Sequence, residues 1–179
     1  MKVALAGAEL EENLGLRYMA SALERQGHQV EIMPFNSDQD TPTVVQSVLD
    51  FQPELTGLSM VFTGRAREFC GLAQALRTAG YPGHIVAGGH FAALNCTQLL
   101  AEFPAFNSVA LGEGEELICN LAAALPDPAP VAGLCYRAAN GAIHTNPSTG
   151  NPDHLDELAF PRRTKFHSDF DSAGSRSVT

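Results

Sequence analysis

The sequence predicts an α/β fold: a doubly wound parallel sheet of five strands, followed by a C-terminal β-hairpin. Five short apolar runs alternate with segments of helical periodicity, which is the pattern of repeated strand–helix units. The connections are short, and Asn140-Gly141 after the last unit is the dipeptide favoured in type I′ hairpin turns. The 179 residues suffice for one sizeable core but not for two ordinary domains with a linker.

The first strand–helix unit shows the pattern most clearly. Residues 2–7 (KVALAG) are a short apolar run typical of a central strand covered on both faces, and residues 8–13 form a loop. A helix then begins at Asn13, and Gly27 can end it in a left-handed cap. The apolar residues of this helix recur at i, i+3, i+4 and i+7, and they are Leu16, Met19, Ala20 and Leu23.

The second unit has a strand over residues 28–34 and a helix over residues 41–51. Thr41 is the expected N-cap of this helix, and Pro42 is expected at its first position, where its missing N–H costs nothing. Pro53 then ends the unit and lets the chain start the next strand.

The third and fourth units carry the features that matter for function. Residues 54–61 are the third strand, and the helix after it ends at Gly80. A tight turn at residues 81–83 leads into residues 85–93 (IVAGGHFAA), a buried strand that ends in paired glycines. A helix over residues 94–103 follows. The apolar face of the helix in the third unit consists of Phe69, Leu72, Ala73 and Leu76.

The fifth unit has a short strand over residues 108–111 and a helix that ends before Pro126. With right-handed crossovers, the five units give a doubly wound parallel sheet. We expect a Rossmann-like binding domain over residues 1–126, a hairpin appended to a sheet edge over residues 127–146, and an irregular tail over residues 147–179.

Charge and composition exclude several classes of function. The net charge of -9, with scattered Lys and Arg, argues against a nucleic-acid surface, so no nucleic-acid partner is expected. No apolar run approaches the roughly 20 residues that cross a bilayer, and no signal peptide precedes the first strand, so a cytoplasmic protein without membrane contact is predicted. The four cysteines lack the spacing of a metal site, and no protein ligand to a metal is predicted.

Ligands of open parallel sheets bind outside the carboxyl ends of the strands, where three loops, residues 8–15, 62–65 and 88–91, should meet, with residues 112–115 beside them. A dinucleotide site is excluded because AGAELEE after the first strand lacks two glycines of GxGxxG and carries acids instead. A P-loop is absent, because the sequence has no GxxxxGK motif. A phosphoacceptor domain would need an Asp after the third strand and a Lys after the fifth, but Val61 and Leu111 lie near those positions. FMN would require a Ser/Thr-rich first loop, which is also missing.

Two neighbouring strands of the predicted sheet carry glycine and serine in place of larger side chains. Gly57 and Ser59 lie in the third strand, and Gly88-Gly89 end the fourth. Where such residues replace larger ones, a flat ring can lie without a clash. Residues 113 and 115 are acids in the first turn of a helix, where they favour the helix dipole even without a ligand.

These residues resemble the motif of the cobalamin-binding fold, DxHxxG…SxL…GG. Ser59-Met60-Val61 matches SxL with Val for Leu, and Gly88-Gly89 matches the glycine pair. Aligning Gly15 with the first motif puts Leu10 at the Asp position and Glu12 at the His position. The resemblance therefore implies bound cobalamin whose cobalt has no histidine below it, a base-off state, with the benzimidazole of the nucleotide tail threaded between strands.

Longer strings are similar to the N-terminal domain of cobalamin-dependent radical SAM enzymes, over about residues 1 to 163. They are EENLGLRYMASALERQGHQV, GLSMVFTGRAREF, GYPGHIVAGGHFA and LGEGEE. The resemblance implies a flavodoxin-like domain, with strand order 2-1-3-4-5, that presents cobalamin to a radical SAM methyltransferase or a related reaction. Residues 156–163 (DELAFPRR) are similar to the linker that precedes the catalytic barrel in that family.

The same resemblance implies which residues contact the cofactor. Gly89→Leu is expected to abolish cobalamin retention and to leave the fold intact. The predicted contacts are Glu12, Asn13, Leu14, Gly15, Gly57, Ser59, Val61, Phe62, Thr63, Gly64, Arg65, Gly88, Gly89, His90, Phe91, Gly112, Glu113, Gly114 and Glu115.

No catalytic residue is predicted, because radical SAM chemistry needs three cysteines for a [4Fe-4S] cluster and CxxxCxxC is absent from this sequence. Whether the chain is an enzyme stays open, and the reaction is assigned to a missing or partner domain. Two other functions also stay open: a stand-alone cobalamin carrier or sensor, and a ligand-free interaction scaffold.

Overall fold

Seven strands form one sheet in the computed structural model, which describes residues 1–10, 12–61, 63–148 and 160–161. The sheet order is β2-β1-β3-β4-β5-β6-β7, and the first five strands are parallel, as the sequence predicted. The strands are β1 (Lys2–Gly7), β2 (Gln29–Pro34), β3 (Leu55–Ser59), β4 (His84–Gly88), β5 (Ser108–Ala110), β6 (Leu134–Arg137) and β7 (Ile143–Thr145).

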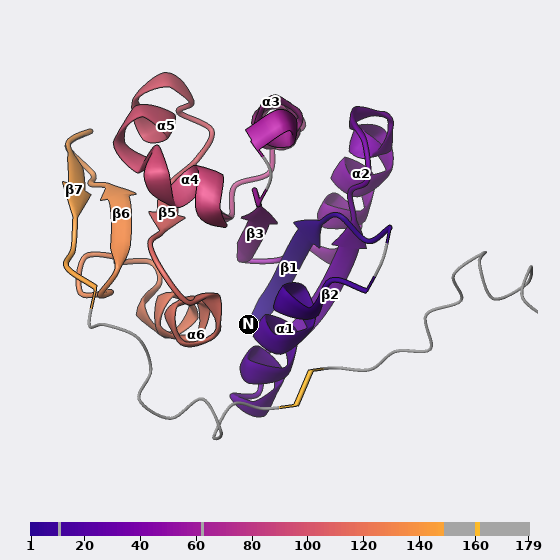
Figure 1. The fold of residues 1–179 in the computed structure, drawn as a ribbon, viewed down its shortest axis with the longest axis horizontal. Coiled ribbons are helices and arrows are strands. Elements are labelled where there is room, and N and C mark those ends of the chain that lie inside the picture. Colours follow the sequence, from indigo (N-terminus) through magenta and orange to yellow (C-terminus); the bar gives the residue numbers. More distant parts are fainter. Residues whose placement is uncertain (11, 62, 149–159, 162–179) are drawn as a thin grey trace, which may run out of the picture.

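Helices cover both faces of the sheet (Figure 1). The first and last helices pack on one face, and the other four pack on the opposite face. Each face therefore buries its own apolar cluster, which is the doubly wound arrangement. The helices are α1 (Leu14–Arg25), α2 (Thr41–Phe51), α3 (Ala66–Thr78), α4 (His90–Leu94), α5 (Cys96–Glu102) and α6 (Gly114–Ala124).

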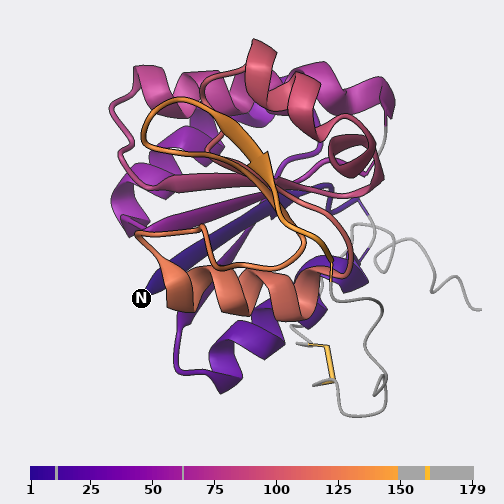
Figure 2. The same cartoon turned by 90° about the vertical axis from the view of Figure 1, so that its left-hand side faces the viewer.

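The hairpin of β6 and β7 extends the sheet beyond β5, and both strands run antiparallel to their neighbours (Figure 2). The predicted type I′ turn is wrong, because only Gly141 has a positive φ, of 85°, and Asn140 does not. The Gly141 N–H donates to the Ala138 carbonyl, and the Ala138 N–H donates to the Ala142 carbonyl. This is the pattern of a type I turn followed by a left-handed glycine, the common longer alternative.

Two helix boundaries differ from the predictions. Asp40, not Thr41, is the N-cap of α2, because a 3-10 turn, Asp38–Asp40, runs directly into the helix. The predicted helix over residues 94–103 is instead two helices that meet at Asn95. The Asn95 side chain donates to the Phe91 carbonyl at 2.8 Å, and this local bond competes with continuation of the helix.

His84 at the start of β4 makes stability depend on pH. Its Nε2 lies 2.7 Å from Oγ of Ser108, and burial, aided by the charge of Arg77, lowers the pKa of His84 from 6.5 to about 4. The unfolded chain therefore takes up a proton near pH 6.5 that the folded protein takes up only near pH 4. Stability is expected to fall by up to about 3 kcal/mol as the pH is lowered through this window.

Urea denaturation at several pH values between 7 and 4 measures this loss. The matched variant His84→Gln keeps a side-chain amide beside Ser108 but has no proton to take up, so its stability should fall less over the same range. Identical pH profiles for the two proteins would assign the loss to other groups.

No helix of the described residues is long and apolar enough to span a bilayer. Most of the predicted linker at residues 156–163, all but residues 160–161, and nearly all of the predicted tail lie outside the described residues.

Candidate functional site

A cavity of about 260 Å³ opens at the carboxyl ends of β3, β4 and β5. It lies between the sheet and the two helices, α1 and α6, that cover this face. The predicted residues that line it are Gly15, Gly57, Ser59, Val61, Gly88, Gly89, His90, Gly112, Glu113, Gly114 and Glu115. The structure thus brings together Gly15 and residues from the predicted loops 88–91 and 112–115, whereas no described residue of the loop 62–65 lines the cavity.

Strand register explains why the cavity exists. Gly57 of β3 pairs with Leu5 and Val86 on its two sides, which forms the inner level of the cavity. Ser59 pairs with Gly88 one level nearer the carboxyl edge. A Cβ at Gly88 would have no heavy atom nearer than the Cβ of Ala110, at 4.0 Å, so the space in front of this glycine is empty. A Cβ at Gly57 would lie 3.0 Å from Cδ2 of Leu5, so the side chain of Leu5 partly covers that glycine and the open space lies at the Gly88 level.

Gly89 has a different role from Gly88. Its φ is 96°, and a Cβ there would lie 2.8 Å from the backbone carbon and oxygen of Met60. The chain's own backbone therefore requires a glycine at this position. The expectation that Gly89→Leu leaves the fold intact is wrong, because any larger side chain would displace the Met60 peptide.

Arg17 of α1 organises the loop between β1 and α1. Its Nη2 donates to Oε2 of Glu9 at 2.7 Å, and its Nε lies 3.3 Å from Oε1 of Glu12. Arg17 and Glu9 are only 3% and 6% exposed, so this pair is buried. Burial raises the pKa of the Glu9 carboxyl, and the charge of Arg17 opposes that rise. The carboxylate of Glu12, at the motif's histidine position, is thus drawn towards Arg17.

Asn13 holds the end of the same loop. Its Oδ1 accepts from the Leu16 N–H at 3.2 Å, which caps α1, and its Nδ2 donates to the Ala8 carbonyl at 3.0 Å. The side chain is therefore engaged at both ends by the loop itself. Leu14, the first residue of α1, is exposed beside it. Asn13 and Leu14 do not line the cavity, and neither does Glu12.

Two further predicted residues lie on the other side of the sheet. The Arg65 guanidinium stacks over the rings of Phe35 and Phe69, 5.3 Å and 5.2 Å from their centroids, and bonds Glu68 at 2.8 Å. Phe91 packs against the core cluster of that face. Neither residue lines the cavity, and neither does Gly64. Phe62 and the side chain of Thr63 lie outside the described part of the chain.

Sequence reasoning missed the apolar walls of the cavity. Met19 lies on the apolar stripe of α1, which predicts burial but does not say that the stripe faces an open space. The apolar spacing in α6 gives the same incomplete signal. The missed lining residues are Leu5, Met19, Leu58, Val86, Ala110, Leu117 and Ile118.

A larger hollow of about 770 Å³ lies at the opposite edge, near the amino ends of the strands. It is lined by turns such as Gly80, Tyr81 and Pro82, and by the residues after α2 and α6. We place the functional site in the smaller cavity, because ligands of open parallel sheets bind at the carboxyl ends. No group of three or more His, Cys, Asp or Glu among the described residues could hold a metal ion.

Comparison with known proteins identifies the family. A family model described as B12 binding domain matches residues 3–122. None of the curated protein sequences compared with the chain matches it.

Among solved structures, the apo, selenomethionine-labelled cobalamin-dependent S-adenosylmethionine radical enzyme OxsB is similar, with a TM-score of 0.70 and 20% identity. The similarity covers 89% of this chain and 24% of the OxsB chain, so this chain spans about a quarter of that protein.

Two further structures share the fold. A novel cobalamin-binding protein from Desulfitobacterium hafniense DCB-2 gives a TM-score of 0.52 and 21% identity, over 66% of this chain and 57% of that one. The methanol:cobalamin methyltransferase complex MtaBC from Methanosarcina barkeri gives a TM-score of 0.54 and 14% identity, over 72% of this chain and 48% of that one.

Proposed function

The chain belongs to the family of B12-binding domains, and its cofactor is cobalamin; from this premise we propose that it holds cobalamin base-off and without a histidine ligand. The nucleotide tail would enter the cavity between the sheet and helices α1 and α6. The corrin ring would lie across the carboxyl ends of the strands. There Leu14, Val61 and Leu94 expose apolar side chains.

The observation that carries this proposal is the glycine-lined cavity. An engineered apolar cavity of about 150 Å³ admits a benzene ring, and the cavity here measures about 260 Å³. The cavity is therefore large enough for a flat bicyclic base, but it is too small for the corrin ring. The tail would lie along one face of the sheet, under two helices, and not between strands as the sequence suggested.

The absence of a histidine ligand is proposed from Glu12. The motif position of the histidine carries this acid, which lies 3.3 Å from Arg17 Nε. Asn13, the next residue, is occupied as the cap of α1. Both neighbouring polar side chains are thus committed to the protein itself.

Glu12→His is expected to supply a ligand to the cobalt from below. The visible spectrum of the bound cobalamin should then change from the base-off form to a histidine-ligated form. Glu12→Gln, which has similar size and no imidazole, is the matched control and should leave the spectrum unchanged. An unchanged spectrum with Glu12→His would show that the first loop does not approach the metal.

We further propose that the domain serves a radical SAM reaction, such as methyl transfer, in another domain or a partner protein. Bound cobalamin supplies a cobalt that can take up and release a methyl group. The fold of OxsB supports this context, and this sequence has no CxxxCxxC motif of its own. We keep the predicted division into residues 1–126, 127–146 and 147–179. A cytoplasmic location stays a prediction.

Equilibration with hydroxocobalamin, followed by desalting, tests the binding proposal. Retained colour with a base-off spectrum is the expected result. A colourless protein would leave only the ligand-free scaffold. Reading the coding sequence beyond Thr179 separates the other two functions: a CxxxCxxC motif there would exclude the stand-alone carrier.

A further inference from the structure

We propose that the cavity also selects the base at the end of the cofactor's nucleotide tail, and that it favours benzimidazoles over purines. This inference rests on the proposed function, because it assumes that the tail occupies the cavity. Cobamides share the corrin ring and differ in this base, which can be a benzimidazole or a purine such as adenine. The two base classes have similar bicyclic frames and differ in polarity.

The inner level of the cavity is apolar. Leu5 and Val86 flank Gly57 there and are 1% and 3% exposed. Ile118 of α6 also lines the cavity, belongs to the same apolar cluster and is 4% exposed. The backbone groups at this level are paired in the sheet ladder.

The polar side chains among the described lining residues belong to the next level, or to the loops and helix starts of the carboxyl edge. They are Ser59, His90, Glu113 and Glu115. A base at the inner level would therefore have none of these polar side chains beside it as a hydrogen-bond partner.

This distribution disfavours a purine. The six-membered ring of a benzimidazole carries only C–H or methyl groups, whereas that of adenine carries two nitrogens and an amino group. Burying such groups without partners weakens binding by about tenfold to a hundredfold. The apolar walls thus read the polarity of the base, while the small residues set its thickness.

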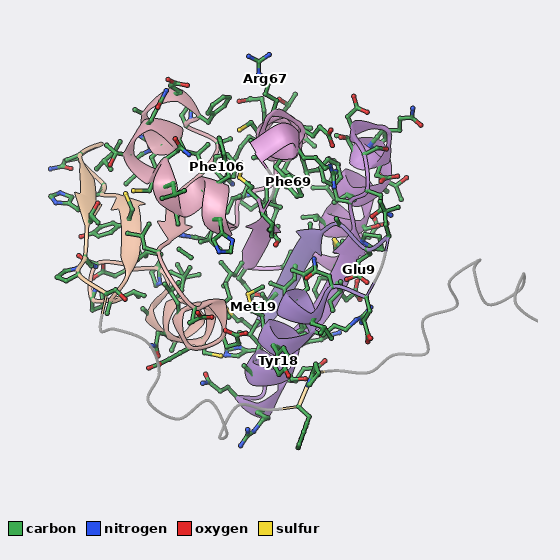
Figure 3. All side chains as sticks on the ribbon, in the orientation of Figure 1. Glu9, Tyr18, Met19, Arg67, Phe69 and Phe106 are labelled. Carbon is green, nitrogen blue, oxygen red and sulfur yellow. The ribbon has the colours of Figure 1, made fainter. Side chains whose placement is uncertain are left out.

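Met19 is the lining residue best placed to test this idea. Its sulfur lies 2.8 Å from where a Cβ on Gly114 would stand, so the side chain reaches from α1 to the start of α6. Figure 3 shows Met19 between these helices, on the side of the sheet opposite Phe69. Glutamine has nearly the same length and also suits a helix. Met19→Gln would place one amide, donor and acceptor together, in the cavity wall.

The experiment measures the affinities of the whole chain for benzimidazolyl and adeninyl cobamides by equilibrium dialysis. In free cobamides the base can bind the cobalt, and the strength of this bond differs between the two bases. The ratio of affinities is therefore compared between variants, since the free-ligand contribution cancels. Met19→Gln is expected to shift the ratio towards adeninyl cobamide by about tenfold. Met19→Leu, the matched apolar control, should shift it by less than about twofold.

Circular dichroism of both variants verifies that they fold. If folded Met19→Gln binds both cobamides with the unchanged ratio, the inference is overturned while the proposed function stands. If Gly88→Leu, which fills the cavity, lowers the affinity for benzimidazolyl cobamide no more than the affinity for cobinamide, which lacks the tail, the tail is not in the cavity and the proposed function itself fails.

Discussion

Gly88→Leu is expected to lower the affinity for cobalamin at least about 100-fold, equivalent to about 2.7 kcal/mol, and to leave the fold intact. The space in front of Gly88 is empty up to Ala110, so a leucine would fill the room that the tail needs. Gly88 also ends a strand with an ordinary negative φ, so the new side chain adds no backbone strain. Hydroxocobalamin titration gives the affinity, and urea denaturation gives the free energy of unfolding.

Gly71→Ala is the control, because Gly71 lies on the exposed face of α3, where an added Cβ meets nothing within 4 Å. It should bind cobalamin as the wild type does. Full affinity in a folded Gly88→Leu protein would mean that the tail lies elsewhere.

Arg17→Met is expected to destabilise the fold by about 3–5 kcal/mol, the usual cost of breaking a buried ion pair from one side. The variant leaves Glu9 buried without the guanidinium that lies 2.7 Å from its Oε2. Its other oxygen, Oε1, already has no hydrogen-bond partner among the described residues. Urea denaturation at pH 7 measures the loss.

The double variant Glu9→Gln, Arg17→Met is the control, because it removes the buried charge as well. It should recover a large part of the lost stability. The deficit of the single variant should also shrink at lower pH, since a carboxyl whose pKa is raised in the folded state is accommodated better when protonated. If the single and the double variant lose the same stability, and the loss is the same at pH 7 and at lower pH, the cause would be lost packing of the Arg17 side chain.

Local patterns allowed the elements and their order to be predicted. The apolar stripe of α1 and its end at Gly27, with φ of 81°, follow from residues close together in the sequence. The split of the helix near Asn95 was missed because a single side-chain bond to Phe91 outweighs helical propensity there. The hairpin was predicted, but its turn type depended on the φ of one residue, Asn140, which composition does not fix.

The candidate site was predicted only in part, because local sequence patterns reveal some of its residues and not others. Gly57, Ser59 and Gly88 were found because small residues in apolar strands stand out in a sequence. Met19 and Ile118 were missed because an apolar helix residue looks the same whether it faces a packed core or a cavity. Arg65 was included because of its place after β3, yet the fold stacks it on Phe35 and Phe69 of the other face.

The sequence by itself determined the parallel sheet and the edge at which the loops meet, because these follow from periodicity and chain connectivity. Only the tertiary structure decided that Gly88 faces open space while Gly89 touches the Met60 peptide. It also decided that Glu12 lies beside Arg17. These contacts depend on how distant segments pack, and packing distances are not encoded in the local spacing of residues.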